Sequence, residues 1–291
     1  MLLKMQTIKR LLIIDGNNAV CRAFFAIRSL TDPQGRPIHA VYGFCKMLMY
    51  LLETYSPSHV AIFFDSYSKR RKELYPEYKM NRKKEGLDDL YNQMLIAKEL
   101  VVKLGMKYIR IDGYEADDLI TVIADKAHKE NLETYIYTTD KDLCQLVTKD
   151  DIVKVLRPGF KGETLLDYEG VAKKFGVTPD NIALYLGLVG DTSDNIPGVI
   201  GIGDKTAAKI INHYLVQQDG HFIFTKDIPE KLKARLIENK SMLKLSFELA
   251  ALKPYEELQL PEVSEFKFDY FGEDAIDYLR SLGFKSIVDK L

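Results

Sequence analysis

Carboxylates stand at the ends of the most apolar stretches of this sequence. Asp15 closes the run RLLIID, Asp65 closes HVAIFFD, and Asp140 closes ETYIYTTD. The segment YEADD follows a fourth apolar run and adds three more acids. The full set of candidate acids is Asp15, Asp65, Glu115, Asp117, Asp118, Asp140, Asp142, Asp191 and Asp194. Because ligands of an open α/β sheet bind beyond the carboxyl ends of its strands, these side chains are expected to converge there.

Such a cluster of negative charge would repel itself unless cations lay within it. Hard oxygen ligands without a neighbouring histidine or cysteine favour magnesium or manganese over zinc. So many ligands predict two Mg²⁺ ions, which Mn²⁺ can replace, and two ions about 3.5–4 Å apart serve phosphoryl displacement. A plainer interpretation stays open for each acid alone, because acids also cap helices, favour the first helical turn, or are simply solvated.

The net charge of the chain is −1, but its charges are unevenly distributed. Residues 69–84, KRRKELYPEYKMNRKK, hold eight basic residues against two glutamates. A basic stretch accompanying an acidic centre indicates a bound polyanion, although a basic run alone is more often a solvated face. The candidates for stabilising charge on a scissile phosphate are Lys79 and Arg82 in this stretch, and Arg22, which follows the apolar run that ends in Asp15.

Other side chains of the basic stretch are predicted to contact nucleic acid. Tyr78 is a candidate for stacking on a base, a contact worth about 1–3 kcal/mol that is indifferent to base sequence. An ordinary half-buried tyrosine is the alternative. The remaining DNA-contacting candidates of the stretch are Lys69, Arg70, Arg71 and Lys83.

A glycine-rich turn, GDTSDNIPGVIGIGDK, covers residues 190–205. Its end resembles a P-loop, but Asp204 separates Gly203 from Lys205 and no strand precedes the run, so that motif is rejected. A turn between two helices can instead offer backbone N–H groups to a DNA phosphate, and a plain helix corner is the alternative. The DNA-contacting candidates of this turn are Gly198, Gly201, Gly203 and Lys205.

Bulk composition excludes several classes of protein. The 291 residues are 46% hydrophobic, which is enough for a core without covalent staples. The cysteines at positions 21, 45 and 144 form no CxxC pair, which argues against a disulfide framework and against a zinc ribbon. The N-terminus lacks a signal-peptide pattern, and no apolar run reaches the length of a membrane span, so a cytoplasmic location is expected.

The order of apolar and amphipathic stretches predicts an α/β fold. Apolar runs at 10–15, 59–65, 106–112 and 133–140 suit buried parallel strands, and helical patterns near 17–28, 39–54 and 87–104 suit helices on both faces. Beyond about residue 175 the strand signals fade, and helices are expected at 179–189, 203–214, 227–238 and 240–251. The predicted domains are an α/β core over 1–175 and a helical module over 176–291.

Five stretches of the chain closely resemble the 5′ nuclease family, in particular the N-terminal 5′-nuclease domain of bacterial DNA polymerase I and its free-standing and phage relatives. They are DGNNAVCRAFFA, FFDSYSKRRKELYPEYKMNRK, GYEADDLI, TTDKDLCQLV and GLVGDTSDNIPGVIGIGDKTAAKII. They occur in the family's order across roughly residues 10–215. The resemblance implies a PIN-like 5′ nuclease core and a metal-dependent phosphodiesterase that cuts 5′ flaps and acts as a 5′-3′ exonuclease.

The resemblance also implies roles for individual residues. It places Asp15, Asp65 and the acids of YEADD around a first metal ion, and the other four acids around the rest of the metal site. Lys79 and Arg82 match the phosphate-contacting pair of a helical arch over 66–86, and Arg22 matches another basic residue of the site. Residues 196–211 match a helix-three-turn-helix that grips duplex DNA and often holds K⁺. Thr139 departs from the glycine usual at its position, and the last 75 or so residues resemble the family weakly.

The expected function is therefore structure-specific cleavage of DNA with 5′ flaps, nicks or free 5′ ends, in replication or repair, by a monomeric protein. A junction-binding module of the same fold that does not cut is the alternative, and the loss of one or more acids would favour it. A metal-dependent phosphatase of small substrates would leave the basic stretch and the glycine turn without a purpose. The sequence stops at Leu291, so no polymerase follows, and a free-standing nuclease and an excised domain are equally compatible with it.

Overall fold

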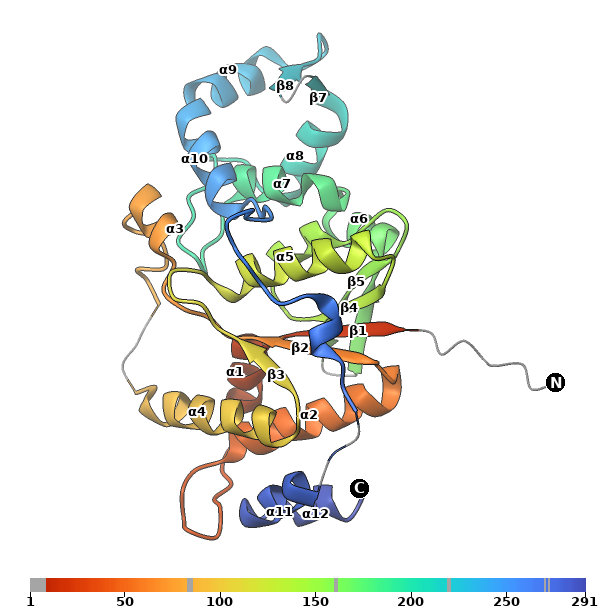
Figure 1. The fold of residues 1–291 in the computed structure, drawn as a ribbon. Coiled ribbons are helices and arrows are strands. Elements are labelled where there is room, and N and C mark those ends of the chain that lie inside the picture. Colours follow the sequence, from red (N-terminus) through yellow and green to blue (C-terminus); the bar gives the residue numbers. More distant parts are fainter. Residues whose placement is uncertain (1–8, 83–85, 160–161, 219–220, 270, 272) are drawn as a thin grey trace, which may run out of the picture.

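The computed structural model describes residues 9–82, 86–159, 162–218, 221–269, 271 and 273–291. A six-stranded sheet in the order β3-β2-β1-β4-β5-β6 forms its centre (Figure 1). All neighbouring strands run parallel except β6, which is antiparallel to β5. The strands are β1 Arg10–Asp15, β2 His59–Phe63, β3 Lys107–Ile109, β4 Glu133–Tyr137, β5 Val153–Gly159 and β6 Gly162–Leu166.

Successive side chains of β1 point to opposite faces of the sheet, and the core of the molecule has one layer on each face. Leu11 and Ile13 belong to the hydrophobic cluster on one face of the sheet, and Leu12 and Ile14 belong to the cluster on the other. All four side chains are fully buried, because β1 is a central strand whose two faces are both covered. A strand of this kind reads as a continuous apolar run, and only its last residue, Asp15, carries a charge.

Helices cover both faces of the sheet (Figure 1). Helix α5 and the 3₁₀ segments η1 and η4 contribute to one cluster, and α1, α2, α4, α11 and α12 contribute to the other. These elements are α1 Gly16–Ala26, α2 His39–Tyr55, α4 Asp88–Lys103, α5 Ala116–Lys129, η1 Asp142–Leu146, η4 Val263–Phe266, α11 Glu273–Ser281 and α12 Lys285–Val288. Helix α3, Lys69–Leu74, lies apart from this layer, near α10.

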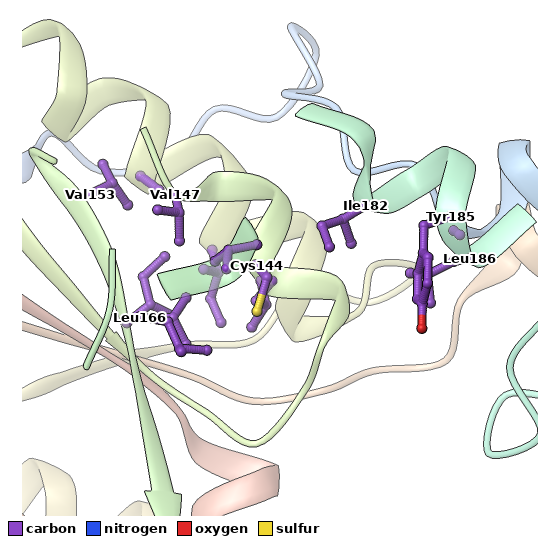
Figure 2. Close-up of a cluster of buried hydrophobic side chains, with 14 of the residues drawn as sticks. Cys144, Val147, Val153, Leu166, Ile182, Tyr185 and Leu186 are labelled. Atoms are coloured by element: carbon purple, nitrogen blue, oxygen red, sulfur yellow. The ribbon is translucent and has the colours of Figure 1, made fainter. Parts of the chain in front are cut away.

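The second half of the chain adds a helical region above α5 in Figure 1. Its elements are α6 Tyr168–Phe175, η2 Pro179–Asn181, α7 Ile182–Val189, α8 Asp204–Lys209, the π-helical segment η3 Ile210–Tyr214, β7 Leu215–Gln218, β8 His221–Phe224, α9 Glu230–Glu238 and α10 Lys240–Ala250. Figure 2 shows how this region joins the core: Cys144 and Leu166 lie with Ile182 at the base of α7 in one continuous hydrophobic cluster. Helix α7 is therefore anchored to the sheet.

The structure differs from the sequence expectations in several local details. Residues 215–218 and 221–224, expected to carry no strand, form the two antiparallel strands of the β7–β8 hairpin. Residues 221–224, HFIF, include two phenylalanines and an isoleucine, which favour strands. The helix expected over 203–214 divides into α8 and the π-helical η3, and the helix expected from 227 begins after Pro229. In the described part of the chain, no helix is both long and apolar enough to cross a membrane.

Candidate active site

The acids gather where the strand order of the sheet reverses. From β1 the chain continues to β2 and β3 on one side and later returns through β4 and β5 on the other. Asp15 is the last residue of β1, Asp65 lies two residues beyond β2, and Asp140 lies three residues beyond β4. Burial raises the pKa of Asp15 to about 8, and the charges of Asp65 and Asp140 add to the shift, which shows that the three carboxylates are neighbours.

Asp15 has two local roles at the end of β1. Its Oδ1 accepts a hydrogen bond from Asn18 N at 3.1 Å and so caps α1, and its Oδ2 accepts one from Thr138 Oγ1 at 2.9 Å. The plain helix-cap interpretation is therefore correct for this residue, but it does not exclude a metal role. A carboxylate that binds an ion must be held in one orientation, and these two hydrogen bonds do that.

Asp65 joins the end of β2 to the start of α5. Its Oδ1 accepts a hydrogen bond from Ala116 N at 2.9 Å, and its own backbone N–H donates to Asn17 Oδ1 at 3.1 Å. Burial raises the pKa of Asp65, although the nearby Lys79 ammonium opposes the shift. Two distant segments of the sequence are thus held together at a single carboxylate.

The YEADD segment both begins a helix and contributes to the cluster. The backbone N–H of Glu115 donates to Asp118 Oδ2 at 3.0 Å, which is the hydrogen bond of a capping box, and α5 starts at Ala116. Burial raises the pKa of Asp118 to about 7, with Asp117 adding to the shift. Three carboxylates in one helical turn are tolerated here because a buried cation faces them.

That cation is Arg71 from α3. Its guanidinium lies 2.7 Å from Glu115, 3.1 Å from Asp117 and 2.9 Å from Asp118, and its Nε donates to Leu249 O. The sequence predicts that Arg71 contacts DNA, but the residue is only 5% exposed and its guanidinium is taken up by acids of the chain. Three close carboxylates hold a planar guanidinium more strongly than solvent does.

Tyr78 requires the same correction. The sequence predicts that its ring stacks on a base, but the side chain is 2% exposed. Its hydroxyl lies 2.9 Å from Glu115 Oε2 and 3.0 Å from Asp194 Oδ2, and its single proton is shared between these two acceptors. Tyr78 therefore bridges two parts of the acidic cluster and offers no ring face to a ligand. A buried hydroxyl needs a partner, and two carboxylates supply it.

Lys79 and Arg82 lie among the acids. The Lys79 ammonium is 2.5 Å from Glu115 Oε1 and 3.4 Å from Asp194 Oδ2, and Arg82 Nη2 is 2.6 Å from Asp194 Oδ1. Burial alone would raise the pKa of Asp194, but these two cations outweigh it and lower the pKa. Arg22 is placed differently, because its exposed side chain donates to Gly159 O at 2.9 Å, at the end of β5.

Asp140 and Asp142 form an acidic pair that makes no ion pair with a described cation. The backbone N–H of Asp142 donates to Asp140 Oδ1 at 2.9 Å, while Asp142 Oδ1 is buried with no hydrogen-bond partner among the described residues. Burial raises the pKa of Asp140 to about 6 and that of Asp142 well above its usual range, with neighbouring aspartates adding to the latter shift. An orphaned buried carboxylate oxygen is the kind of atom that a cation satisfies.

Protein cations neutralise only part of this cluster. The ion pairs that described residues make with it reach five acids: Glu115, Asp117, Asp118, Asp191, which lies 3.2 Å from Lys141, and Asp194. The other four, Asp15, Asp65, Asp140 and Asp142, have raised pKa values and no such partner within the described ranges. The donor set, all hard oxygens, fits a divalent cation such as Mg²⁺. As they stand, however, no three described His, Cys, Asp or Glu side chains are placed so that they could hold one ion.

The remaining predicted DNA-contacting residues of the arch are exposed where the structure describes them. Lys69 and Arg70 are exposed, and Arg70 contacts the Tyr255 hydroxyl and ring. Lys83 lies outside the described residues. Of the expected arch over 66–86, the structure describes residues 66–82 and 86, with α3 followed by a turn at 76–81.

The glycine turn between α7 and α8 is built on close backbone contact. A Cβ at Gly198 would lie 2.3 Å from Val189 O, so only glycine fits there. Gly201 has φ +77°, and its carbonyl accepts a hydrogen bond from Arg235 Nη1 at 3.2 Å. Gly203 is the N-cap of α8, with open space where a side chain would stand, and Lys205 is exposed. The open side of this turn is compatible with a backbone phosphate.

Sequence reasoning missed four residues of the site. Lys141 neutralises Asp191, and Thr138 orients Asp15. Asn81 and Asn195 join the basic stretch to the loop that carries Asp194. Lys141 could have been found, since it stands between two candidate acids in TTDKD. The two asparagines carry no charge and lie 114 residues apart in sequence, so only the fold reveals them.

Comparison with known families agrees with this geometry. A family model described as "5'-3' exonuclease, N-terminal resolvase-like domain" matches residues 10–176, which is more than half of the chain. A second, "5'-3' exonuclease, C-terminal SAM fold", matches residues 177–271. The chain belongs to the 5′-3′ exonuclease family. The predicted family is thereby confirmed.

Individual relatives support the same family assignment. DNA polymerase I of Bacillus subtilis is 35% identical over 289 residues, which cover 97% of this chain and 32% of that protein. A 5′-3′ exonuclease of Aquifex aeolicus is 36% identical over 265 residues, which cover 89% of this chain and 90% of that one. The chain thus spans about a third of the length of the polymerase I relative and nearly all of the exonuclease.

Solved structures share the fold of this 5′-3′ exonuclease family member. The T5 D15 protein, co-crystallised with metal ions, has TM-score 0.67 at 20% identity and covers 97% of this chain and 96% of its own. The catalytic core of Rad2, in complex with a DNA substrate, has TM-score 0.58 at 16% identity and covers 97% of this chain and 90% of its own. The predicted fold class, a mainly parallel sheet with helices on both faces and a helical second region, is confirmed.

Proposed function

We propose that this chain hydrolyses DNA phosphodiesters at 5′ flaps and free 5′ ends, using two divalent ions held by the acidic cluster. The observation that carries the proposal is the juxtaposition of uncompensated acids with phosphate-binding cations. Two buried acids, Asp15 and Asp142, and two partly buried ones, Asp65 and Asp140, lack a cationic partner among the described residues. Lys79 and Arg82 lie beside other acids of the same cluster. Phosphoryl transfer needs both features, because charge builds on the phosphate as well as on the water that attacks it.

In this proposal the acids and the basic residues have different roles. Asp15, Asp65, Asp140 and Asp142, together with the acids of YEADD and Asp191 and Asp194, would hold two Mg²⁺ ions, which Mn²⁺ can replace. Bound there, the ions supply an activated water and neutralise charge on the leaving oxygen. Lys79 and Arg82 give part of their charge to Asp194 in the free protein, and we infer that they turn to the scissile phosphate when DNA binds.

The glycine turn would bind the duplex at a place separate from the site of cleavage. Gly198 and Gly201 allow the tight backbone of the turn, Gly203 leaves open space at the start of α8, and Lys205 adds positive charge. We further propose that the protein acts as a monomer on nicked or flapped DNA in replication or repair. We also propose that a K⁺ ion binds at this turn.

Cleavage of a flapped duplex tests the proposal directly. The substrate carries a 5′ label on the flap and is incubated with Mg²⁺, with Mn²⁺, or with EDTA. Product cut within a nucleotide or so of the junction, present with either ion and absent with EDTA, is the expected result. Tight binding without cleavage under all three conditions would contradict it and favour a junction-binding module. Affinity that does not fall with rising salt would argue against DNA as the ligand altogether.

A further inference from the structure

Two short loops of the site are joined by a two-way exchange of hydrogen bonds. Asn195 Nδ2 donates to Glu77 O at 2.7 Å, and Asn81 Nδ2 donates to Thr192 O at 2.7 Å. Between these two contacts the backbone N–H of Lys79 donates to Asp194 O at 2.8 Å. Each loop thus offers one amide side chain to a main-chain carbonyl of the other, and neither asparagine belongs to the acidic or basic sets described above.

Both loops contain a residue in the left-handed region of backbone conformation. Lys79 and Asn195 each have φ +55°. Asparagine adopts this conformation readily, but a lysine with a full side chain does so only where its surroundings impose it. The surroundings of Lys79 are the loop 191–195, which holds its backbone N–H and, through the two asparagines, the residues on either side of it. The unusual conformation is therefore a consequence of the contact between the loops.

This conformation decides where the functional groups of the loop point. The Lys79 ammonium reaches Glu115 and Asp194, and the Tyr78 hydroxyl reaches the same two acids. If Lys79 relaxed to an ordinary extended or helical conformation, its side chain would leave the loop in another direction. The position of the ammonium thus depends on residues that never touch it.

We propose that Asn195 and Asn81 are positioning residues that fix the loop 75–82 against the loop 191–195 and thereby aim Lys79 at the reacting phosphate. The proposal rests on the proposed function for its effect on cleavage, but the contact between the loops can be measured without any substrate. Their role is to restrict the backbone of Lys79 to one conformation before DNA arrives, so that only its side chain has to turn from the acids to the phosphate.

The main variant is Asn195→Gly, which keeps the freedom for φ +55° and removes only the amide donor. Asn81→Ala removes the other donor. The matched control is Asn131→Gly, because Asn131 is exposed, has φ +54° and lies between α5 and β4, away from the acids. Single-turnover cleavage of a flapped duplex is measured at saturating enzyme, and affinity for the same DNA is measured without divalent ions.

We expect the single-turnover rate to fall by about 10-fold or more in Asn195→Gly and Asn81→Ala, without a change in affinity, because a small misplacement of a catalytic group is costly. The control should cut as the unaltered protein does. Combining Asn195→Gly with Lys79→Ala should be no slower than Lys79→Ala alone, because a positioning residue has no effect once its target is gone. Unchanged rates, equal losses of rate and affinity, or additive effects with Lys79→Ala would overturn the proposal.

Hydrogen exchange of the free protein separates this proposal from the proposed function. The amide of Lys79 is bonded to Asp194 O, so Asn195→Gly should speed exchange in residues 75–82, and Asn131→Gly should not. If the unaltered protein fails to cut DNA but exchange responds in this way, the proposed function fails and the contact between the loops stands. If exchange does not respond, the positioning role is refuted whether or not the protein cuts.

Discussion

Two halves of the acidic cluster differ in how their charge is balanced. Around Glu115, Asp117 and Asp118 a buried guanidinium, Arg71, supplies the opposing charge. Around Asp15 and its neighbours beyond β1, β2 and β4, the described residues supply hydrogen bonds but no ion pair. Burial raises pKa values in both halves, so the ion pairs are what distinguish them. In the first half a cation of the chain balances the negative charge. In the second half the balancing cation must come from solution. We therefore expect the uncompensated half to have the greater need for a divalent ion.

The largest effect is expected from the pair Asp191 and Asp194. Replacing both with asparagine should abolish cleavage while duplex binding stays largely intact, because the acids are lost but the cations beside them, Lys141, Lys79 and Arg82, remain. Rates and binding are measured on the same flapped duplex. The control is the double replacement of Asp269 and Asp277, two exposed aspartates in surface ion pairs. Retained turnover would show that these acids are dispensable.

Asp15→Asn tests the uncompensated half. We expect cleavage to fall by about 1,000-fold, because several kcal/mol of charge stabilisation depend on a bound ion. Asparagine caps a helix as well as aspartate does, so α1 should keep its start. In EDTA at pH 8 the variant should unfold at a higher temperature than the unaltered protein, since a buried charge with no partner is removed. Lower thermal stability under those conditions would mean that Asp15 is compensated after all.

Arg71→Met converts the compensated half into an uncompensated one. Removing one partner of a buried ion pair costs about 3–5 kcal/mol, so urea unfolding in EDTA should occur at a clearly lower concentration. Mg²⁺ should recover more stability in this variant than in the unaltered protein, because three carboxylates become available to it. The control is Arg280→Met, since the Arg280 side chain is 64% exposed and pairs with Asp277, whose side chain is 73% exposed. Equal losses in both variants would remove the distinction between the two halves.

Lys79→Ala should have a smaller effect on rate. We expect cleavage to slow by about 100-fold, the usual cost of removing one group that stabilises developing charge, with little loss of duplex affinity. The comparison is with Lys129→Ala, whose ammonium is 72% exposed and pairs with Asp125 on α5. Equal losses of rate and affinity would refute a place for Lys79 at the scissile phosphate.

The sequence was informative about the acids and misleading about the basic stretch. Apolar strands that end in aspartate predict convergence at one sheet edge, since the strands are local patterns and the edge follows from parallel pairing. The burial of Arg71 and Tyr78 depends on contacts with Leu249 and Asp194, which lie 178 and 116 residues away. A run of like charges looks solvated from sequence alone, and nothing local shows that acids will cover part of it. The β7–β8 hairpin was missed because its strands have four residues each.

The dependence of stability on pH and Mg²⁺ should show the smallest effect and is the most direct test of the comparison. Carboxyls whose folded pKa is raised, as for Asp15 to about 8 and Asp140 to about 6, bind protons more tightly when folded than when unfolded. Their contribution is therefore fully present at low pH and is lost as pH rises from about 4 to about 8. In EDTA the melting temperature should fall across this window.

Mg²⁺ should reverse this fall in melting temperature, because the bound ion replaces the protons that the folded acids release as the pH rises. Its stabilising effect should be greater at pH 8 than at pH 5, at about 2–4 °C for each kcal/mol gained. Asp15→Asn should flatten the pH dependence. The lowered pKa of Asp194 acts at more acidic pH and does not interfere, since the stability it contributes is lost only as pH falls below the window. A Mg²⁺ effect of the same size at both pH values would mean that the ion does not bind at the uncompensated acids.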